Sequence, residues 1–154
     1  MSTWLQTEAE RAFGRANRSR RRARLVRRVR RVCACCDRLA IAMPTPGRQA
    51  ARGVREIPLE RIHGTLEPNR AEHFDYDFRP DATVRERWQR LWVAEARGAV
   101  LPPISVVPTD DGYAVRDGHH RVSVARARGA ITIDATVDAA ALSVRAAARR
   151  GGSA

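Results

Sequence analysis

Five consecutive residues carry the side chains best suited to chemistry, Asp117-Gly118-His119-His120-Arg121. A glycine between a strand and a helix lets the backbone turn tightly, so the first free N–H groups of the helix point at a ligand and favour an anion. The Arg121 guanidinium could make bidentate contacts to phosphate or carboxylate. His119 or His120 could donate to phosphate or move a proton, since imidazole titrates near neutral pH. These five residues are therefore the predicted ligand-binding turn.

A purely structural role for the same residues remains open. In that alternative His119 caps the turn, His120 packs, and Arg121 pairs with Asp117 or with an acid of the 72–81 loop. The acids of that loop could hold hydrated Mg²⁺ beside a triphosphate, or could simply be solvated. They are Glu72, Asp75, Asp77 and Asp81. The cofactor is thus left unknown, with a nucleotide and Mg²⁺ as the candidate, and no residue is assigned as a metal ligand.

The segments before the turn predict a strand, a loop and a helix. Residues 56–62 are typical of an edge strand, because an internal proline excludes a central one. Residues 63–82 have only isolated apolar side chains and predict a long loop. Thr83 and Glu86 have capping-box spacing at the start of a helix with an apolar face, which ends at Gly98.

The segments on either side of the turn predict a hairpin, a helix and a last strand. Residues 104–107 and 113–115 are β-branched or apolar runs, and the turn residues 109–112 between them indicate a hairpin. The helix that begins at Gly118 should end near Arg128, and residues 131–137 alternate as in a strand. The whole pattern predicts an α+β domain in which the hairpin and the helix position the turn.

Two strings resemble the N-terminal domain of the ParB family, which shares its fold with sulfiredoxin. They are Leu101-Pro102-Pro103-Ile104-Ser105-Val106 before the hairpin and Asp117-Gly118-His119-His120-Arg121-Val122-Ser123-Val124-Ala125 after it. Gly118, Arg121 and Ala125 fall on the glycine, the last arginine and the alanine of the family's glycine-acid-arginine-arginine box. The resemblance implies a small ParB/sulfiredoxin-like domain over residues 55–138, with a mixed sheet, packed helices and a phosphate or nucleotide ligand.

The same comparison also marks where this chain departs from the family. His119 and His120 replace the central glutamate and arginine of the box, and His119 stands where sulfiredoxin has its catalytic cysteine, so sulfinic acid reductase activity is not expected. The aromatic-acidic string at 74–78 resembles a short, stand-alone actinobacterial type, which implies a fold and no established reaction. Partitioning proteins add a helix-turn-helix domain, whereas only residues 139–154 follow the last predicted strand. We therefore do not expect sequence-specific operator binding.

The positive charge lies almost entirely before the domain. The formal net charge is +12, and residues 1–46 predict a basic helical arm that precedes a Pro- and Gly-containing linker. The arginines of residues 18–31 are the predicted nucleic-acid contacts: Arg18, Arg20, Arg21, Arg22, Arg24, Arg27, Arg28, Arg30 and Arg31. Such a helix is marginal unless it packs or its charge is neutralised. Binding to phosphate backbones would be independent of base sequence.

Other roles of the arm remain open. It could be an inert solvated segment, could dock onto an acidic protein, or could lie on anionic lipid. Three cysteines within residues 33–36 do not make a disulfide framework and fit a reducing compartment. On a helix, Cys33 and Cys36 would lie on an apolar stripe and pack there.

The resulting hypothesis is a cytoplasmic ParB-like binding protein. No run of residues is apolar enough to cross a bilayer, and the start of the chain is unlike a secretory signal. Its partners would be a nucleotide or phosphate ligand and non-specific nucleic acid, and its oligomeric state is left open. The alternatives are a nucleotide-dependent phosphotransferase or hydrolase, with His120 as acid or base, and an adaptor for an acidic partner.

Overall fold

The structure is a computed structural model that describes residues 2–47 and 50–139. Its helices (α, and η for 3₁₀) and strands are α1 (Ser2–Val29), η1 (Ala34–Asp37), β1 (Ala51–Pro58), η2 (Leu59–Arg61), β2 (Ile62–Thr65), α2 (Pro68–Ala71), η3 (Ala82–Val84), α3 (Arg85–Ala96), β3 (Ile104–Thr109), β4 (Gly112–Asp117), α4 (His119–Ala127) and β5 (Thr132–Val137). The α+β class is confirmed. The tail predicted for 139–154 lies, apart from its first residue, outside the described residues.

The five strands form one mixed sheet in the order β1-β5-β3-β4-β2. β1 is an edge strand that pairs antiparallel with β5, and its proline, Pro58, is its last residue. β3 pairs parallel with β5 and antiparallel with β4, and β4 pairs parallel with β2 at the other edge. The predicted hairpin, last strand and edge strand are therefore confirmed.

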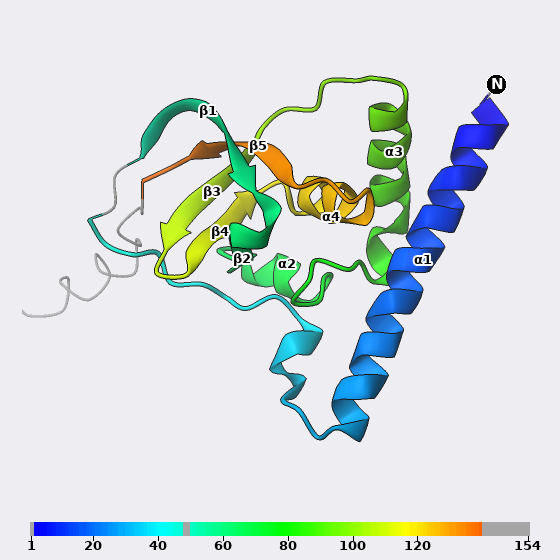
Figure 1. The fold of residues 1–154 in the computed structure, drawn as a ribbon, viewed down its shortest axis with the longest axis horizontal. Coiled ribbons are helices and arrows are strands. Elements are labelled where there is room, and N and C mark those ends of the chain that lie inside the picture. The colour runs from blue at the N-terminus through cyan, green and yellow to red at the C-terminus, as the bar shows by residue number, and fades with distance from the viewer. Residues whose placement is uncertain (1, 48–49, 140–154) are drawn as a thin grey trace, which may run out of the picture.

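The helices α4, α3 and α1 follow one another outward from one side of this sheet. Figure 1 shows α4 next to the strands, α3 beyond α4, and the long helix α1 alongside α3. The core is continuous through these layers. Its largest fully buried side chains are Trp88, Phe13, Phe74, Phe78, Leu39, Ile57, Ile62, Ile104, Val106, Val107, Val115 and Val122. Within the described ranges, no helix has the length and apolar content needed to span a membrane.

The first half of α1 belongs to the core. Ala9, Ala12 and Phe13 are buried, and the Phe13 ring meets the Trp88 ring edge-on at a centroid distance of 5.5 Å. The helix runs without interruption from Ser2 to Val29. An arm that acts independently of the domain does not agree with this packing, because its removal would expose the aromatic core.

The arginine-rich second half of α1 is held by hydrogen bonds rather than by an apolar stripe. The Arg20 guanidinium donates to the backbone oxygens of His73, Asp37 and Glu72 at 2.9, 3.1 and 2.9 Å. Arg27 donates to the Asp37 carboxylate at 2.7 Å. The apolar side chains at this end of the helix and just after it lie at the surface, with Leu25, Val29 and Val32 more than half exposed. These bonds explain how a helix with so much like charge is stabilised.

Two local predictions were wrong. Residues 63–82 are not one long loop, because β2, α2 and η3 all include residues of this stretch. The cap before α3 is Asp81, whose carboxylate accepts the Thr83 N–H at 2.9 Å, so the predicted Thr83–Glu86 capping box does not start this helix. The 3₁₀ turn η3 precedes α3 and moves the N-cap of α3 from the predicted Thr83 to Val84.

Candidate functional site

The predicted turn lies where β4 passes into α4, and only glycine fits at its centre. Gly118 has φ +106°, and a Cβ added there would lie 2.5 Å from Cγ2 of Ile104. The β3–β4 pairing is irregular between Ser105 and Val106, directly opposite this turn. Such an irregularity redirects the end of a strand. The sequence prediction that Gly118 allows a tight strand-to-helix turn is thus confirmed.

The start of α4 has no side-chain cap. The first bond of the helix runs from the Val122 N–H to the Gly118 carbonyl at 3.0 Å. The N–H groups of His119, His120 and Arg121 precede it and have no carbonyl one helical turn behind them. They are the donors available to an anion, and the positive end of the helix dipole favours negative charge at the same place.

Both histidine rings are packed into the protein. His119 and His120 are 4% and 7% exposed. The His119 ring nitrogen Nε2 is 2.6 Å from Oγ1 of the buried Thr65, and the ring is stacked on Phe74. His120 meets the same Phe74 ring edge-on at a centroid distance of 5.4 Å. The His120 ring packs, as the structural alternative predicts. The His119 ring instead bonds to Thr65 of β2 and does not cap the turn.

These surroundings lower the pKa of His119 and of His120 to about 4. Burial is the main cause for both rings, followed by the positive charge of Arg70 for His119 and of Arg87 for His120. Because the rings are neutral at physiological pH, the expected proton transfer near neutrality does not agree with the structure.

A pH dependence of stability follows. Unfolding returns each histidine to its ordinary pKa of about 6.5, so the unfolded chain binds more protons than the folded chain between roughly pH 6.5 and pH 4. Stability should be fully present above that window and should fall as pH decreases through it, by up to about 3 kcal/mol for each ring.

We expect the imidazole NMR signals of His119 and His120 to stay constant from about pH 8 to pH 5. A midpoint near the ordinary value for either ring would contradict the burial argument.

Arg121 is engaged within the protein. Its guanidinium donates to the carbonyls of Pro102 and Pro103, the latter at 2.8 Å, and to the Asp117 carboxylate at 2.7 Å. Its side chain is 15% exposed. Arg121 therefore ties the segment before β3 to the end of β4, which is the structural alternative left open by the sequence. Removing its side chain should destabilise the turn, because three acceptors would lose their donor.

Two arginines that the sequence analysis did not select lie at the start of α4. Arg70 of α2 and Arg87 of α3 line a cavity of about 60 Å³ together with Gly118, His119 and His120. Among the described residues, neither arginine has a carboxylate partner, although most arginines near the core are paired. The volume is that of about two water molecules. Two free guanidinium groups and three backbone N–H groups thus surround a space suited to a small anion.

Three of the four loop acids have internal partners, whereas Glu72 is exposed and its carboxylate has no ion pair among the described residues. Asp75 is fully buried, and its carboxylate accepts the N–H groups of Asp77 and Arg79 at 3.0 and 2.9 Å. Asp81 caps η3 and Asp77 pairs with Arg79 at 3.0 Å. In the described part of the chain, no three His, Cys, Asp or Glu side chains are grouped to hold a metal ion. These carboxylates organise the loop, which does not agree with a Mg²⁺ site built from them.

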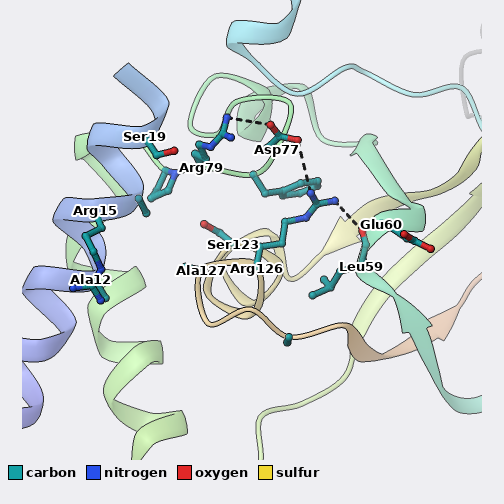
Figure 2. Close-up of a pocket in the computed structure, with 14 residues that line it drawn as sticks. Ala12, Arg15, Ser19, Leu59, Glu60, Asp77, Arg79, Ser123, Arg126 and Ala127 are labelled. Atoms are coloured by element: carbon teal, nitrogen blue, oxygen red, sulfur yellow. Dashed lines mark hydrogen bonds and ion pairs between the residues drawn. The ribbon is translucent and has the colours of Figure 1, made fainter. Parts of the chain in front are cut away.

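A second cavity, of about 600 Å³, lies away from the turn. Figure 2 shows Arg79 and Arg126 directed at Asp77 inside it, and Arg126 also reaches the carbonyl of Leu59 at 2.8 Å. This cavity opens between α1 and the C-terminal part of α4. Arg79 and Arg126 pair with Asp77 in this cavity, whereas Arg15 and Glu60 also line it and have no ion pair among the described residues. The turn differs because its cavity joins Arg70 and Arg87, which have no carboxylate partner in the described part of the chain, to an uncapped helix start.

The predicted nucleic-acid contacts divide into two groups. Arg20 and Arg27 are half-buried and hold the fold, and Arg24 lies 3.3 Å from the Asp37 carboxylate. The other predicted arginines are exposed and, within the described residues, have no ion pair: Arg18, Arg21, Arg22, Arg28, Arg30 and Arg31. Six cations on one exposed helix end could contact phosphate groups.

The fold and the site together define an α+β protein with an anion-suited helix start beside a five-stranded mixed sheet. No family model matches the sequence, and no curated protein matches it. Among solved structures, the chain is similar to sulfiredoxin from Arabidopsis thaliana. The two share 20% sequence identity with a TM-score of 0.43, and the match covers 64% of this chain and 94% of that chain.

Proposed function

We propose that this chain is a ParB-like binding protein that holds a phosphate-bearing ligand at the start of α4. The N–H groups of His119, His120 and Arg121 would donate to phosphate oxygens, and Arg70 and Arg87 would neutralise the charge. Asp117 and Arg121 would position the turn rather than contact the ligand through their side chains. The observation that carries the proposal is a pair of arginines, without ion pairs in the described part of the chain, at an uncapped helix start, because both features favour an anion.

Binding is favoured over catalysis by the state of the two histidines. A general acid or base works best when its pKa lies near the working pH, and both rings have a pKa of about 4. Their ring atoms are also engaged with Thr65 and Phe74. A nucleotide-dependent phosphotransferase or hydrolase would need a different residue as its base.

A thermal-shift series tests the ligand class. We expect pyrophosphate and nucleoside triphosphates to raise the melting temperature, since a ligand at about 100 times its Kd stabilises the folded state by roughly 2.7 kcal/mol. Each ligand is measured with and without Mg²⁺, with chloride at equal ionic strength as the control, and the nucleotides are analysed afterwards for hydrolysis. If no phosphate compound shifts the melting temperature beyond the chloride control, the proposed site is wrong.

The basic end of α1 supports a second, separable activity, non-specific binding to nucleic acid. Six exposed arginines without acid partners in the described residues favour phosphate backbones. Each lost phosphate contact should reduce the slope of log affinity against log salt by about 0.9 for duplex DNA.

We therefore expect the triple variant Arg21→Gln, Arg22→Gln, Arg28→Gln to bind random duplex DNA more weakly and with a shallower salt dependence than the wild type. The matched control is Arg90→Gln with Arg97→Gln, which removes exposed charge from α3 and from its C-cap. Fluorescence anisotropy at several salt concentrations measures both quantities. Affinity of the wild type that does not change with salt would contradict a role in phosphate-backbone binding.

A further inference from the structure

A turn with three thiols follows α1 at the protein surface. Cys33 and Cys35 are exposed, Cys36 is half-buried, and all three are free. The sequence predicts that Cys33 and Cys36 pack on the apolar stripe of a helix. The structure contradicts this, because α1 ends at Val29, Cys33 is the N-cap of the separate turn η1, and Cys35 and Cys36 lie within η1. Neither proposed binding activity uses these side chains.

The thiols of this turn are not equivalent. The Cys33 sulfur accepts the Cys35 backbone N–H at 3.1 Å. Hydrogen bonds from Cys35 lower the pKa of Cys33, whereas the bond to Cys33 is the main reason that the pKa of Cys35 is raised to about 11. The Cys35 N–H donated to the Cys33 sulfur favours the thiolate, which is the reactive form of cysteine.

Geometry also selects which pair of thiols can join. The sulfur atoms of Cys35 and Cys36 are 3.9 Å apart, but the Cα atoms of adjacent residues are only about 3.8 Å apart across a trans peptide. Disulfides usually need a Cα separation of about 4.4–6.8 Å. Cys33 and Cys35 are not adjacent, and the Cys33 sulfur already lies against the Cys35 backbone. This pair therefore meets the requirement better.

We propose that Cys33 is a peroxide-sensitive thiol and that Cys35 converts its oxidised form into a disulfide within the same turn. The Cys33 thiolate attacks one peroxide oxygen, the O–O bond breaks, and a sulfenic acid and one water form. The Cys35 sulfur then attacks the Cys33 sulfur, the S–O bond breaks, and a second water leaves. Two thiols lose two electrons in total, and the peroxide is reduced to water.

Hydrogen peroxide treatment of the full chain, followed by mass spectrometry, tests the proposal. The wild type should lose two hydrogen masses, and fragmentation of the peptide containing residues 32–38 should place the bond between Cys33 and Cys35. Cys35→Ser should instead accumulate a sulfenic acid at Cys33 that dimedone traps. In Cys33→Ser, alkylation of the remaining thiols at neutral pH should be about tenfold slower than that of Cys33 in the wild type.

Cys36→Ser is the matched control and should be oxidised as the wild type is. The proposal is overturned if Cys33→Ser is oxidised as fast as the wild type, if the bond joins Cys35 to Cys36, or if oxidation only links two chains. Far-ultraviolet circular dichroism of each variant verifies that the fold is kept, and a variant that loses it is replaced by the alanine substitution at the same position.

Discussion

Phe13→Ala is expected to lower the free energy of unfolding by about 3–5 kcal/mol, the usual cost of removing a buried phenylalanine side chain. Phe13 is 1% exposed, lies against Trp88, and has the Arg85 guanidinium 5.1 Å above its ring. Trp88 in turn donates its ring N–H to Ser123 of α4 at 2.9 Å. The substitution should therefore loosen the helix whose first turn forms the candidate site, and chemical denaturation measures the loss.

Leu25→Ala is the matched control on the same helix. Leu25 is 59% exposed, so its truncation should change the free energy of unfolding by no more than about 0.5 kcal/mol. Equal, small effects of both substitutions would show that the first half of α1 is not part of the core. A large effect of Phe13→Ala alone supports a single cooperative unit that includes α1.

The elements close to the site could be predicted because short-range patterns specify them. Gly118 marks the strand-to-helix turn, and the turn residues at 109–112 mark the hairpin. The course of α1 could not be predicted in the same way. Its charged half is stabilised by bonds from Arg20 to the backbone of residues 72–73, which are distant in the sequence.

The chemistry of the site was only partly predictable for the same reason. The sequence identified the backbone donors of the turn but assigned the cationic role to Arg121, which bonds instead to two proline carbonyls and Asp117. Arg121 also lines the cavity but is paired with Asp117, and the cavity arginines without an ion pair in the described residues are Arg70 and Arg87, from two other helices. No spacing rule connects these arginines to the turn, because the tertiary fold alone brings α2 and α3 to the start of α4.

Replacing both cavity arginines should have the largest effect on ligand binding. One charge-assisted hydrogen bond contributes about 1.5–3 kcal/mol, and because Arg70 and Arg87 are exposed we expect the lower value for each. The double variant Arg70→Gln, Arg87→Gln should therefore bind pyrophosphate about 100-fold more weakly than the wild type. Its free energy of unfolding should change by no more than about 0.5 kcal/mol, since neither side chain packs in the core.

Isothermal titration of pyrophosphate into the wild type, this double variant and the control Arg90→Gln with Arg97→Gln is the most direct measurement. The control removes the same charge from exposed positions of the neighbouring helix and its C-terminal end, so it corrects for the general loss of positive potential. We predict near wild-type affinity for the control and about a 100-fold loss for the double variant. Wild-type affinity in the double variant, or an equal loss in the control, would contradict an anion site at the start of α4.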